Sequence, residues 1–447
     1  MSTSQPELAT KIVSWGGTAV VGRELHSEDL TAITRDVPLA RGLGRSYGDA
    51  SLPPPDELRV AGTRLADRVL AFDTATGVVR AEAGLALQTL NRLFLGRGFY
   101  SPVTPGTQYI SLGGMVAADV HGKNHHASGS TGAHLRSLRL RVGDGRIVGC
   151  SLDRESELFR ATIGGMGLTG HVLEVELQLE AIPSPWILSE SLRIDDIDHF
   201  VAELKASASD WPYTMGWIDC VSRGRRMGRG ILNRGRWARP EEAPARLPTP
   251  LQRPDFPVQM PGWVLSRPFV RVLNEGLYRV HVPKRKRGIR HPETFFYPLD
   301  AIGHWNRLYG RRGFTQYQCV LPDEAGPGAA RRLLELLTRK GRASPLCVIK
   351  DCGPQGVGTL SFPLRGISVA IDFAIRADTQ SIIDDLNEHV IGEGGRVYLA
   401  KDLFTRAEHL RRMDQRLETW LAVRDKWDPQ HRLRSAQSVR LLGDRSS

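Results

Sequence analysis

A glycine-rich segment at residues 41–49 limits the possible folds of this chain more than any other feature of the sequence. It reads RGLGRSYGD and follows the strand-like residues 37–40. A loop of this composition can present several backbone N–H groups to a diphosphate. A Rossmann fold would begin a helix here, but the next residues, ASLPPP at 50–55, cannot form a helix interior because proline lacks the required N–H. We therefore expect a phosphate-binding loop in a fold that is not of the Rossmann type.

A second glycine motif, GMGLTG at residues 165–170, matches the dinucleotide pattern G-x-G-x-x-G letter for letter. It follows a helical run at 156–162 and leads into a strand at 171–179, which reverses the order found in a Rossmann unit. The match to that fingerprint is therefore accidental. Two interpretations stay open: a glycine-rich connection between helix and strand, or a close approach of the backbone to a bound cofactor.

The composition is that of a soluble globular protein with two or three domains. Of the 447 residues, 41% are hydrophobic and 24% are charged, which is enough for a large core. The five cysteines form no C-x-x-C pair, which argues against a disulfide scaffold and a zinc ribbon. No basic segment leads into an apolar run at the N-terminus, and no window reaches the ~18 apolar residues of a membrane span. We expect neither a secretory signal nor an integral membrane protein.

The chain is basic, with 60 Lys and Arg against 49 Asp and Glu and a formal net charge of +11. Basic surfaces attract nucleic acid, anionic lipid or phosphorylated substrates. Because no segment has the pattern of a helix-turn-helix, zinc finger or RRM, we expect no nucleic-acid partner.

Hydrophobic periodicity predicts a mixed α+β chain whose composition changes near residue 184, at the sequence IPSP. The predicted strands lie at 78–83, 138–142, 147–150, 171–179, 316–321, 346–350 and 367–373. The predicted helices lie at 87–95, 156–162, 380–391 and 407–427.

Residues 240–283 hold nine of the 27 prolines together with the aromatic residues Phe256, Trp263 and Phe269. We expect a long mobile surface loop there. The basic run KRKRGIR at 284–290 follows directly, so apolar and basic residues adjoin. The loop is interpreted either as a membrane-facing segment or as a solvated loop without a partner.

The densest signal for a functional site is the window 101–132, which reads SPVTPGTQYISLGGMVAADVHGKNHHASGSTG. Its small residues let a backbone approach a flat or phosphorylated ligand, and its histidines and lysine supply titratable groups. A metal site built from His121, His125 and His126 is a weaker alternative because Asp119 is the sole acidic neighbour. Purely structural histidines are a further alternative.

These motifs, RGLGRSYGD, PGT, DVHGKNHHASGS and GGMGLTG, resemble the decaprenylphosphoryl-β-D-ribose 2′-oxidases, FAD-binding PCMH-type flavoproteins of the vanillyl-alcohol-oxidase superfamily. The resemblance continues in order through GWID, FYPLD, WNR, FTQYQ, YLAKD and VRDKWDP, and so covers nearly the whole chain. It implies an α+β fold in which a two-part FAD-binding domain encloses a substrate domain with an antiparallel sheet covered by helices. The implied divisions are 1–184 and 395–447 for the FAD-binding domain and 185–394 for the substrate domain, with a mobile loop at 238–292.

The resemblance also implies the cofactor site. Covalently flavinylated relatives carry a histidine where this chain has Arg45, so the FAD is expected to be non-covalent and no metal is expected. The residues implied to bind FAD are Arg41, Gly42, Leu43, Gly44, Arg45, Ser46, Tyr47, Pro105, Gly106, Thr107, Ser111, Gly113, Gly114, Ala118, Val120, His121, Asn124, His125, Ser128, Gly129, Gly167, Gly170, Val172 and Tyr398.

The implied reaction is oxidation of the 2′-hydroxyl of a polyprenylphosphoryl-β-D-ribose to the 2′-keto sugar. The implied catalytic residues are Lys401, which stabilises negative charge, His121, a base or hydroxyl-orienting group suited by its pKa near neutrality, and Tyr47. The residues implied to contact substrate are Lys123, Trp217, Tyr297, Gln316, Gln318, Lys350, Ser368 and Ala370. Ordinary core packing is the alternative for Trp217 and Tyr297, and a solvated sheet face is the alternative for the two glutamines, which lie two apart on one strand.

One motif departs from the family. The family sequence NICVDF, whose cysteine is trapped by nitroaromatic inhibitors, reads SVAIDF at 368–373 in this chain. Alanine cannot form that adduct, and hydride transfer needs no thiol. Ser368 in place of asparagine alters the expected sugar contacts.

The resemblance places the reaction in the 2′-epimerisation that makes the arabinose donor for arabinan and cell-wall synthesis. It implies a quinone or oxygen as electron acceptor, an NADH-dependent short-chain reductase as partner, and peripheral membrane contact on the cytoplasmic face, with the periplasmic face left open. The alternative function is oxidation of another sugar, an alditol or an aldonolactone. Prenyl length, acceptor and oligomeric state are not determined by the sequence.

Overall fold

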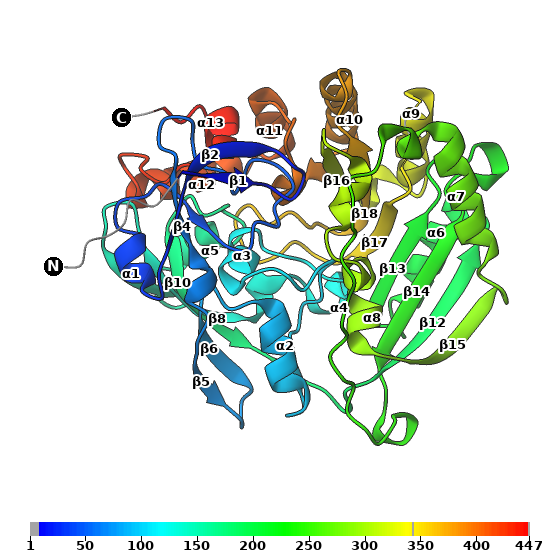
Figure 1. Cartoon of the computed structure of the whole chain (residues 1–447), viewed down its shortest axis with the longest axis horizontal. Helices are drawn as coiled ribbons and strands as arrows, with labels where there is room; N and C mark the ends of the chain where they lie inside the picture. The colour runs from blue at the N-terminus through cyan, green and yellow to red at the C-terminus, as the bar shows by residue number, and fades with distance from the viewer. Residues whose placement is uncertain (1–8, 342–343, 446–447) are drawn as a thin grey trace.

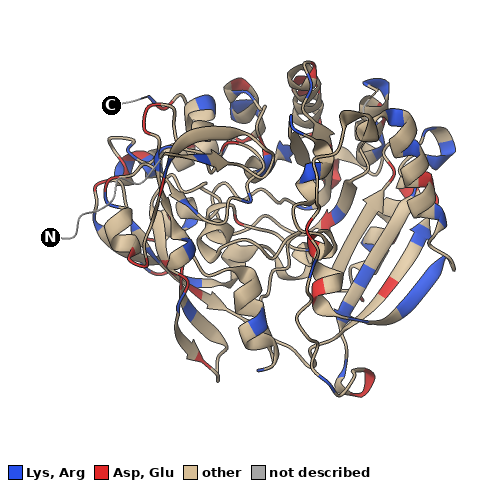
Figure 2. Cartoon of the chain, viewed as in Figure 1, with Lys and Arg blue, Asp and Glu red and all other residues tan. Residues whose placement is uncertain are grey.

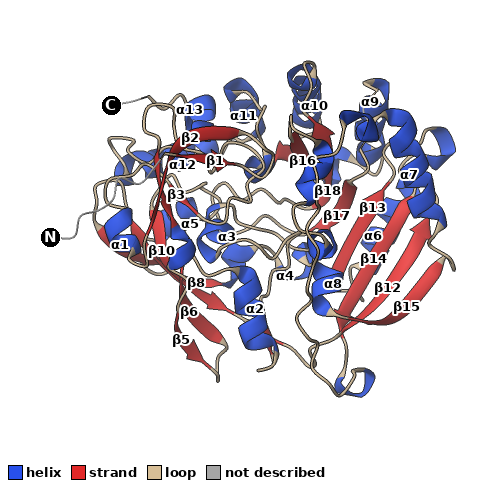
Figure 3. Ribbon diagram, viewed as in Figure 1, coloured by secondary structure: helices blue, strands red, loops and turns tan. Residues whose placement is uncertain are grey.

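The computed structural model of the chain describes residues 9–341 and 344–445, so the first eight residues of the expected FAD-binding unit and residues 446–447 lie outside the described part. Within that part the strands form four sheets. The first sheets lie on one side of Figure 1 and the eight-stranded sheet on the other, with loops between them. Figure 3 shows that most of these central segments are loops rather than helices or strands.

The first part of the chain builds three of these sheets, the smallest of which pairs β7 (Phe99–Tyr100) with β11 (Glu180–Ala181). The strands β1 (Thr10–Val13), β2 (Ala19–His26), β4 (Arg59–Gly62) and β3 (Ala40–Arg41) form one sheet in that order, with parallel pairing of β4 to β2 and β3. The strands β5 (Val69–Asp73), β6 (Val78–Glu82), β10 (His171–Gln178), β8 (Leu135–Arg141) and β9 (Ile147–Ser151) form an antiparallel sheet. The predicted strands at 78–83, 138–142, 147–150 and 171–179 are confirmed. The predicted strand at 37–40 is wrong, since pairing begins only at Ala40.

The remaining elements of the first part connect or cover these sheets. They are α1 (Leu30–Ile33), α2 (Leu87–Leu95), α3 (Leu112–Ala117), α4 (His125–Ser128) and α5 (Ser156–Thr162). The predicted helices at 87–95 and 156–162 are confirmed by α2 and α5.

The second sheet system is one antiparallel sheet of eight strands. Its order is β15 (Arg285–Arg290), β12 (Ile187–Ile194), β14 (Gly230–Trp237), β13 (Tyr213–Ile218), β17 (Cys347–Cys352), β18 (Gly366–Ala374), β16 (Phe314–Pro322) and β19 (Arg396–Val397). The helices α6 (Ile197–Ser207), α9 (Ala329–Arg339) and α10 (Thr379–Gly392) pack their apolar side chains on one face of it. A further short helix, α8 (Pro292–Phe296), follows β15.

Side chains on the central strands alternate between the helices and the other face of the sheet. Odd-numbered residues such as Cys319, Ile349 and Ile371 join the core with the helices, so Gln318 and Ala370 lie on the opposite face. That face carries the polar residues of three neighbouring strands. The predicted strands at 316–321, 346–350 and 367–373 and the helix at 380–391 are confirmed.

The C-terminal segment returns to the first sheets, as Figure 1 shows for the red helix α13 beside β2. It contains α11 (Ala407–Met413), α12 (Leu417–Trp427) and α13 (Ala436–Leu442). The Arg434 backbone N–H donates to Pro38 O at 3.0 Å, and the Ala436 N–H donates to Leu52 O at 3.0 Å. These contacts join the C-terminal segment to the first part of the chain. The strand β19, however, pairs with β16 in the eight-stranded sheet, so a boundary at residue 394 would divide that sheet, and the division at residues 184 and 394 stays a prediction.

One of the predicted helices is wrong. The expected helix at 407–427 is two helices, because Asp414 leaves the helical conformation and its carboxylate accepts from the backbone N–H of Arg416 at 3.1 Å, a local bond that competes with helix hydrogen bonds.

The expected loop at 238–292 is not one continuous loop. It contains the short 3₁₀ turn η5 (Gly262–Leu265) and the 13-residue helix α7 (Arg267–Arg279), and its basic run forms the edge strand β15, paired in register with β12. Pro268 stands in the first turn of α7, where a helix tolerates proline, so the prolines delimit ordered elements here.

Candidate active site

A cavity of about 260 Å³ lies between the loops of the first part and the polar face of the eight-stranded sheet. Its walls come from the glycine loop, the 105–121 segment, the 166–172 connection, strands β16 to β18, and the 3₁₀ turn η9 (Leu399–Lys401). The tertiary structure therefore brings together the motifs that are spread over the whole sequence.

The glycine loop is packed so closely that side chains are excluded at two positions. A Cβ atom on Gly42 would lie 2.2 Å from Ser111 Oγ, and one on Gly48 would lie 1.7 Å from the backbone O of Asp402. Arg440 of α13 holds this contact together, because its guanidinium donates to Asp49 at 2.8 Å and to Asp402 at 2.9 Å. The C-terminal helix thus fixes the loop against the turn that carries Lys401.

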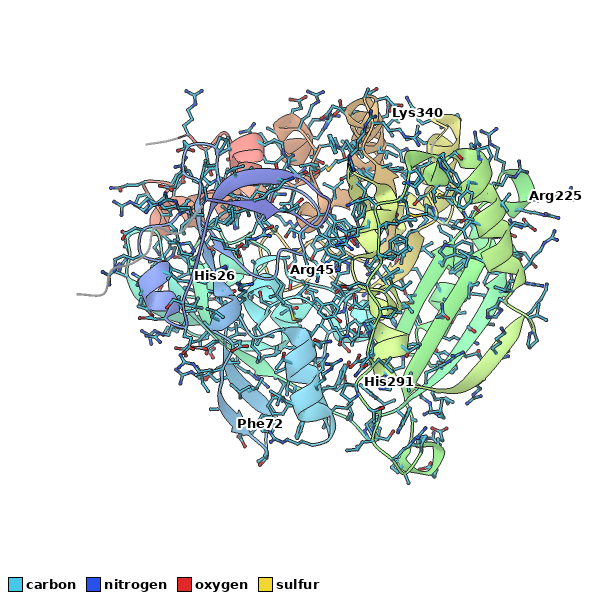
Figure 4. The ribbon with its side chains drawn as sticks, viewed as in Figure 1. His26, Arg45, Phe72, Arg225, His291 and Lys340 are labelled. Atoms are coloured by element: carbon cyan, nitrogen blue, oxygen red, sulfur yellow. The ribbon has the colours of Figure 1, made fainter. Side chains whose placement is uncertain are left out.

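Arg45 projects from the same loop and is labelled near the centre of Figure 4. Its guanidinium carbon lies 4.1 Å from the ring centroid of Trp15 and 5.2 Å from that of Tyr109, and it lines the cavity. Its Nε atom is buried and has no hydrogen-bond partner within the described residues. A buried, unpaired donor at a cavity wall fits an anionic ligand group such as a diphosphate.

The window 101–132 forms the next wall. Ser111 caps the short helix α3, and Asp119 adopts a φ of 38° while its buried carboxylate accepts from Ser130 Oγ at 2.7 Å and from the Gly132 N–H at 2.8 Å. Such a strained conformation persists only where the surroundings enforce it. It turns the following residues, Val120 and His121, to the cavity.

His121 is held in one tautomer by the sheet. Its Nε2 atom lies 2.9 Å from Gln318 Nε2, so the amide donates and the imidazole proton resides on Nδ1. Burial, aided by the positive charge of Lys350, lowers the pKa of His121 well below its ordinary value. The ring is therefore neutral near pH 7.

Lys401 also lines the cavity, and its Nζ atom lies 3.6 Å from the ring centroid of Tyr47. Burial lowers the pKa of Lys401 to about 7, against the opposing carboxylate of Asp372. Burial also raises the pKa of Asp372 to about 6, although its carboxylate accepts from Gln316 Nε2 at 2.5 Å and from the Tyr309 hydroxyl at 2.8 Å. A lysine with a pKa near 7 can accept or release a proton under physiological conditions.

A third cation, Lys350, lines the cavity from β17 and makes no ion pair with the described residues. Arg45, Lys350 and the protonated form of Lys401 outnumber Asp300, the acidic residue in the cavity lining. The cavity is therefore electropositive and suits an anionic substrate or cofactor.

Most of the predicted site residues line this cavity. From the predicted cofactor set these are Gly42, Leu43, Gly44, Arg45, Ser46, Tyr47, Pro105, Gly106, Thr107, Ser111, Gly113, Gly114, Ala118, Val120, His121, Gly167, Gly170, Val172 and Tyr398. From the predicted catalytic and substrate sets these are Lys401, Gln316, Gln318, Lys350 and Ala370. The GMGLTG segment is thus a helix-to-strand connection whose backbone also reaches the cavity.

The other predicted residues do not line the cavity. They are Arg41, Lys123, Asn124, His125, Ser128, Gly129, Trp217, Tyr297 and Ser368. The Lys123 ammonium donates to the carbonyls of Pro105 and Phe296, and Trp217 Nε1 donates to Pro345 O at 2.9 Å. Tyr297 is fully buried in the hydrophobic core.

Sequence reasoning missed several lining residues. They are Trp15, Leu39, Ala40, Ala50, Ser51, Thr63, Ala83, Ile110, Ala117, Met166, His171, Leu299, Asp300, Trp305, Leu346, Val348 and Ala400. Most of them lie inside or beside the motifs, so their closeness in sequence to a motif could have identified them as lining residues. Trp15 and the supporting Tyr309 carried no such signal, because only the folded chain brings them to the site.

The described residues contain no group of three or more His, Cys, Asp and Glu side chains that could hold a metal ion. His125 Nδ1 accepts from the Gly353 N–H at 2.9 Å, and the carboxylate of Asp119 is occupied by hydroxyl and amide donors.

The fold and the site define a class of protein. A family model described as an FAD binding domain matches residues 31–151, which contain the glycine loop and the 105–121 wall. The closely packed glycines and the unpaired Arg45 fit that cofactor. The chain is an FAD-dependent oxidoreductase with a PCMH-type α+β fold, acting on a CH–OH group.

Relatives place it more narrowly. The chain is 32% identical to the decaprenylphosphoryl-β-D-ribose oxidase of Mycolicibacterium smegmatis, over 96% of this chain and 97% of that protein. It is 33% identical to a Streptomyces coelicolor protein described as an uncharacterized protein in the mprA 5′ region, over 77% of this chain and 96% of that protein. It is 29% identical to bovine mitochondrial D-2-hydroxyglutarate dehydrogenase over 30% of this chain and 26% of that protein. The chain belongs to the decaprenylphosphoryl-β-D-ribose oxidase family.

Proposed function

We propose that this enzyme oxidises the 2′-hydroxyl of a polyprenylphosphoryl-β-D-ribose to the 2′-ketone, the first half of a 2′-epimerisation that makes an arabinose donor for cell-wall synthesis. The full-length similarity to a decaprenylphosphoryl-β-D-ribose oxidase supports the substrate class. The observation that carries the proposal is the polar sheet face, where Gln316, Gln318 and Lys350 converge on Lys401 in an electropositive cavity. This arrangement suits a hydroxylated ring that bears a phosphate diester.

The proposed roles follow from the protonation states. FAD, when bound, supplies the acceptor for the hydride equivalent that leaves the carbinol carbon. The lone pair of His121 Nε2 is taken by Gln318, so His121 orients the hydroxyl through Nδ1–H. Lys401 Nζ, neutral above pH 7, accepts the hydroxyl proton, and the resulting ammonium is stabilised by the Tyr47 ring and Asp372. Lys350 binds the phosphate.

The test is an anaerobic titration of the purified enzyme with a polyprenylphosphoryl ribose while the flavin band near about 450 nm is recorded. We expect the band to bleach. A yellow protein whose flavin stays oxidised would contradict the proposed substrate, and the same titration would then be made with other sugars, alditols or aldonolactones. A protein that takes up no FAD would contradict the whole proposal.

The proton-acceptor role of Lys401 predicts the pH dependence. Because the pKa of Lys401 is about 7, kcat/KM is expected to fall as the pH drops below about 7 and Nζ becomes charged. The carboxylate of Asp372 favours the charged form of Lys401 and so raises its pKa. Asp372→Asn is therefore expected to lower this pKa and to move the acidic limb of the kcat/KM profile to lower pH. A pH profile of both enzymes is the measurement, and a limb that moves to higher pH in the variant would contradict the assignment.

We propose that FAD is held without a covalent bond, since Arg45 stands at the position of the histidine used by flavinylated relatives. Acid precipitation of the holoenzyme is expected to leave all of the flavin in the supernatant. Yellow colour in the washed pellet would contradict this expectation.

Ala370 lines the cavity, whereas the five cysteines are buried elsewhere and do not line it. Nitroaromatic inhibitors activated by turnover are therefore expected to leave this enzyme without a covalent adduct. Ala370→Cys is expected to create a trapping site, seen by mass spectrometry as an adduct on that peptide. An adduct at residue 370 of the unaltered protein would contradict the expectation.

We further propose a quinone or oxygen as the electron acceptor, an NADH-dependent short-chain reductase that completes the epimerisation, and peripheral contact with a membrane that holds the lipid-linked substrate. Across the described residues, no helix is long and apolar enough to cross a bilayer. The cytoplasmic face of the membrane is the side we favour.

A further inference from the structure

The helix α7 contacts the rest of the protein through side chains that include one apolar and two polar residues, Val270, Asn274 and Glu275. Asn274 is fully buried and its Nδ2 donates to Asp219 Oδ1 at 2.8 Å. Glu275 pairs with Arg229 at 2.5 Å. These contacts and the buried Val270 anchor one face of the helix.

The outer face of α7 is apolar and exposed. Val272 is 73% exposed, and Phe269, Leu273 and Leu277 beside it are also exposed. The preceding Trp263 is 62% exposed and packs edge-on against Phe269, with ring centroids 5.6 Å apart. A surface helix normally turns its apolar face to the core, so this face is built to be covered by something outside the chain.

The positive charge around the apolar face of α7 indicates which kind of partner covers it. Residues 263–290 contain eight Lys and Arg but a single acidic residue, Glu275. Arg271 and Arg287 make no ion pair with the described residues, and Figure 2 shows Lys and Arg gathered along β15 beside α7. A second copy of the chain would bring the same cations to the contact and repel the first, whereas anionic lipid headgroups would neutralise them.

We propose that α7 lies in the interface of an anionic bilayer, with Trp263, Phe269, Val272 and Leu277 among the acyl chains and the surrounding arginines and lysines at the headgroups. This proposal specifies the membrane contact of the proposed function, but it depends on no property of the sugar.

The docking surface adjoins the cavity. The turn η5, directly before α7, contacts the 3₁₀ turn η7 (Trp305–Tyr309), and Leu265 of η5 packs with Tyr47 and Tyr309. Trp305 of η7 lines the cavity. A phosphate-linked sugar whose prenyl chain stays in the membrane would therefore enter close to its binding site.

The experiment is co-sedimentation of the FAD-loaded enzyme with sugar-free vesicles of phosphatidylcholine, with or without about one third phosphatidylglycerol. We expect binding at least about tenfold stronger to the anionic vesicles. The double variant Val272→Asp, Leu277→Asp is expected to lose at least about tenfold of that binding. The variant Arg271→Ser, Arg287→Ser is expected to weaken binding to the anionic vesicles alone.

The matched control is Val21→Asp, which alters an apolar residue on β2 that is 65% exposed and remote in sequence from α7. It is expected to bind like the unaltered enzyme, and an unchanged flavin spectrum would show that each variant is folded. Unchanged binding of the Val272→Asp, Leu277→Asp variant, equal binding to neutral and anionic vesicles, or a dimer that this variant abolishes would overturn the proposal. Because the vesicles hold no sugar, such a failure is distinct from failure of the flavin titration.

Discussion

Replacing Lys401 by methionine is expected to lower kcat for the alcohol oxidation by about a thousandfold or more. A positioned general base contributes about 10²–10⁴-fold, and Lys401 is the cavity lysine whose Nζ lies over the Tyr47 ring, with the carboxylate of Asp372 acting on its pKa. Methionine keeps the length of the side chain but can neither accept a proton nor carry a charge. The measurement is the anaerobic rate constant for bleaching of the flavin at saturating substrate.

Two controls separate chemistry from damage to the fold. Lys11→Met removes an exposed lysine on β1 outside the cavity and is expected to leave that rate constant unchanged. Lys350→Met is expected chiefly to raise KM, since we assign Lys350 to the phosphate. A rate constant for Lys401→Met within about tenfold of the unaltered enzyme would refute the role of Lys401 as proton acceptor.

Gly48→Ala is expected to destabilise the protein by about 3 kcal/mol and to prevent retention of FAD. The added Cβ would lie 1.7 Å from the backbone O of Asp402, and neither backbone can yield, because Arg440 ties Asp49 to Asp402. Separation of these two segments would also displace the neighbouring Lys401. The measurements are the thermal unfolding midpoint and the FAD content after gel filtration.

Gly149→Ala is the matched control. Gly149 lies on β9, and a Cβ there has no heavy atom within 4 Å. We expect this variant to keep its FAD and its unfolding midpoint. If Gly48→Ala behaved in the same way, the close contact between the glycine loop and the Lys401 turn would be wrong.

The alternation of residue types predicted the strands of the central sheet well, because successive side chains of a strand point to opposite faces. The alternation of Gln316, Tyr317 and Gln318 predicted that the two glutamines share a face, and the structure places both on the cavity wall. The same period places Lys350 and Ala370 on that face. What the pattern could not state is which strands are neighbours: β17, β18 and β16 adjoin in the sheet although β16 precedes the other two in the chain.

Local pattern failed where long-range polar contacts decide the structure. Residues 267–279 were expected in a mobile loop, yet they form α7 because Asp219 and Arg229, from distant segments, bind Asn274 and Glu275. The periodicity of 407–427 suited one helix, but the chain leaves the helical conformation at Asp414, whose side-chain carboxylate accepts from the Arg416 backbone N–H.

The sequence by itself determined that the glycine loop cannot begin a Rossmann helix, that the chain is α+β, and to which family it belongs, because these depend on prolines, local periodicity and motif order. Only the tertiary structure decided the chemistry of the site. The tautomer of His121, the lowered pKa of Lys401 and the network around Asp372 arise from burial and from partners far away in the chain. Electrostatics of this kind depends on distance in space, which a linear sequence does not contain.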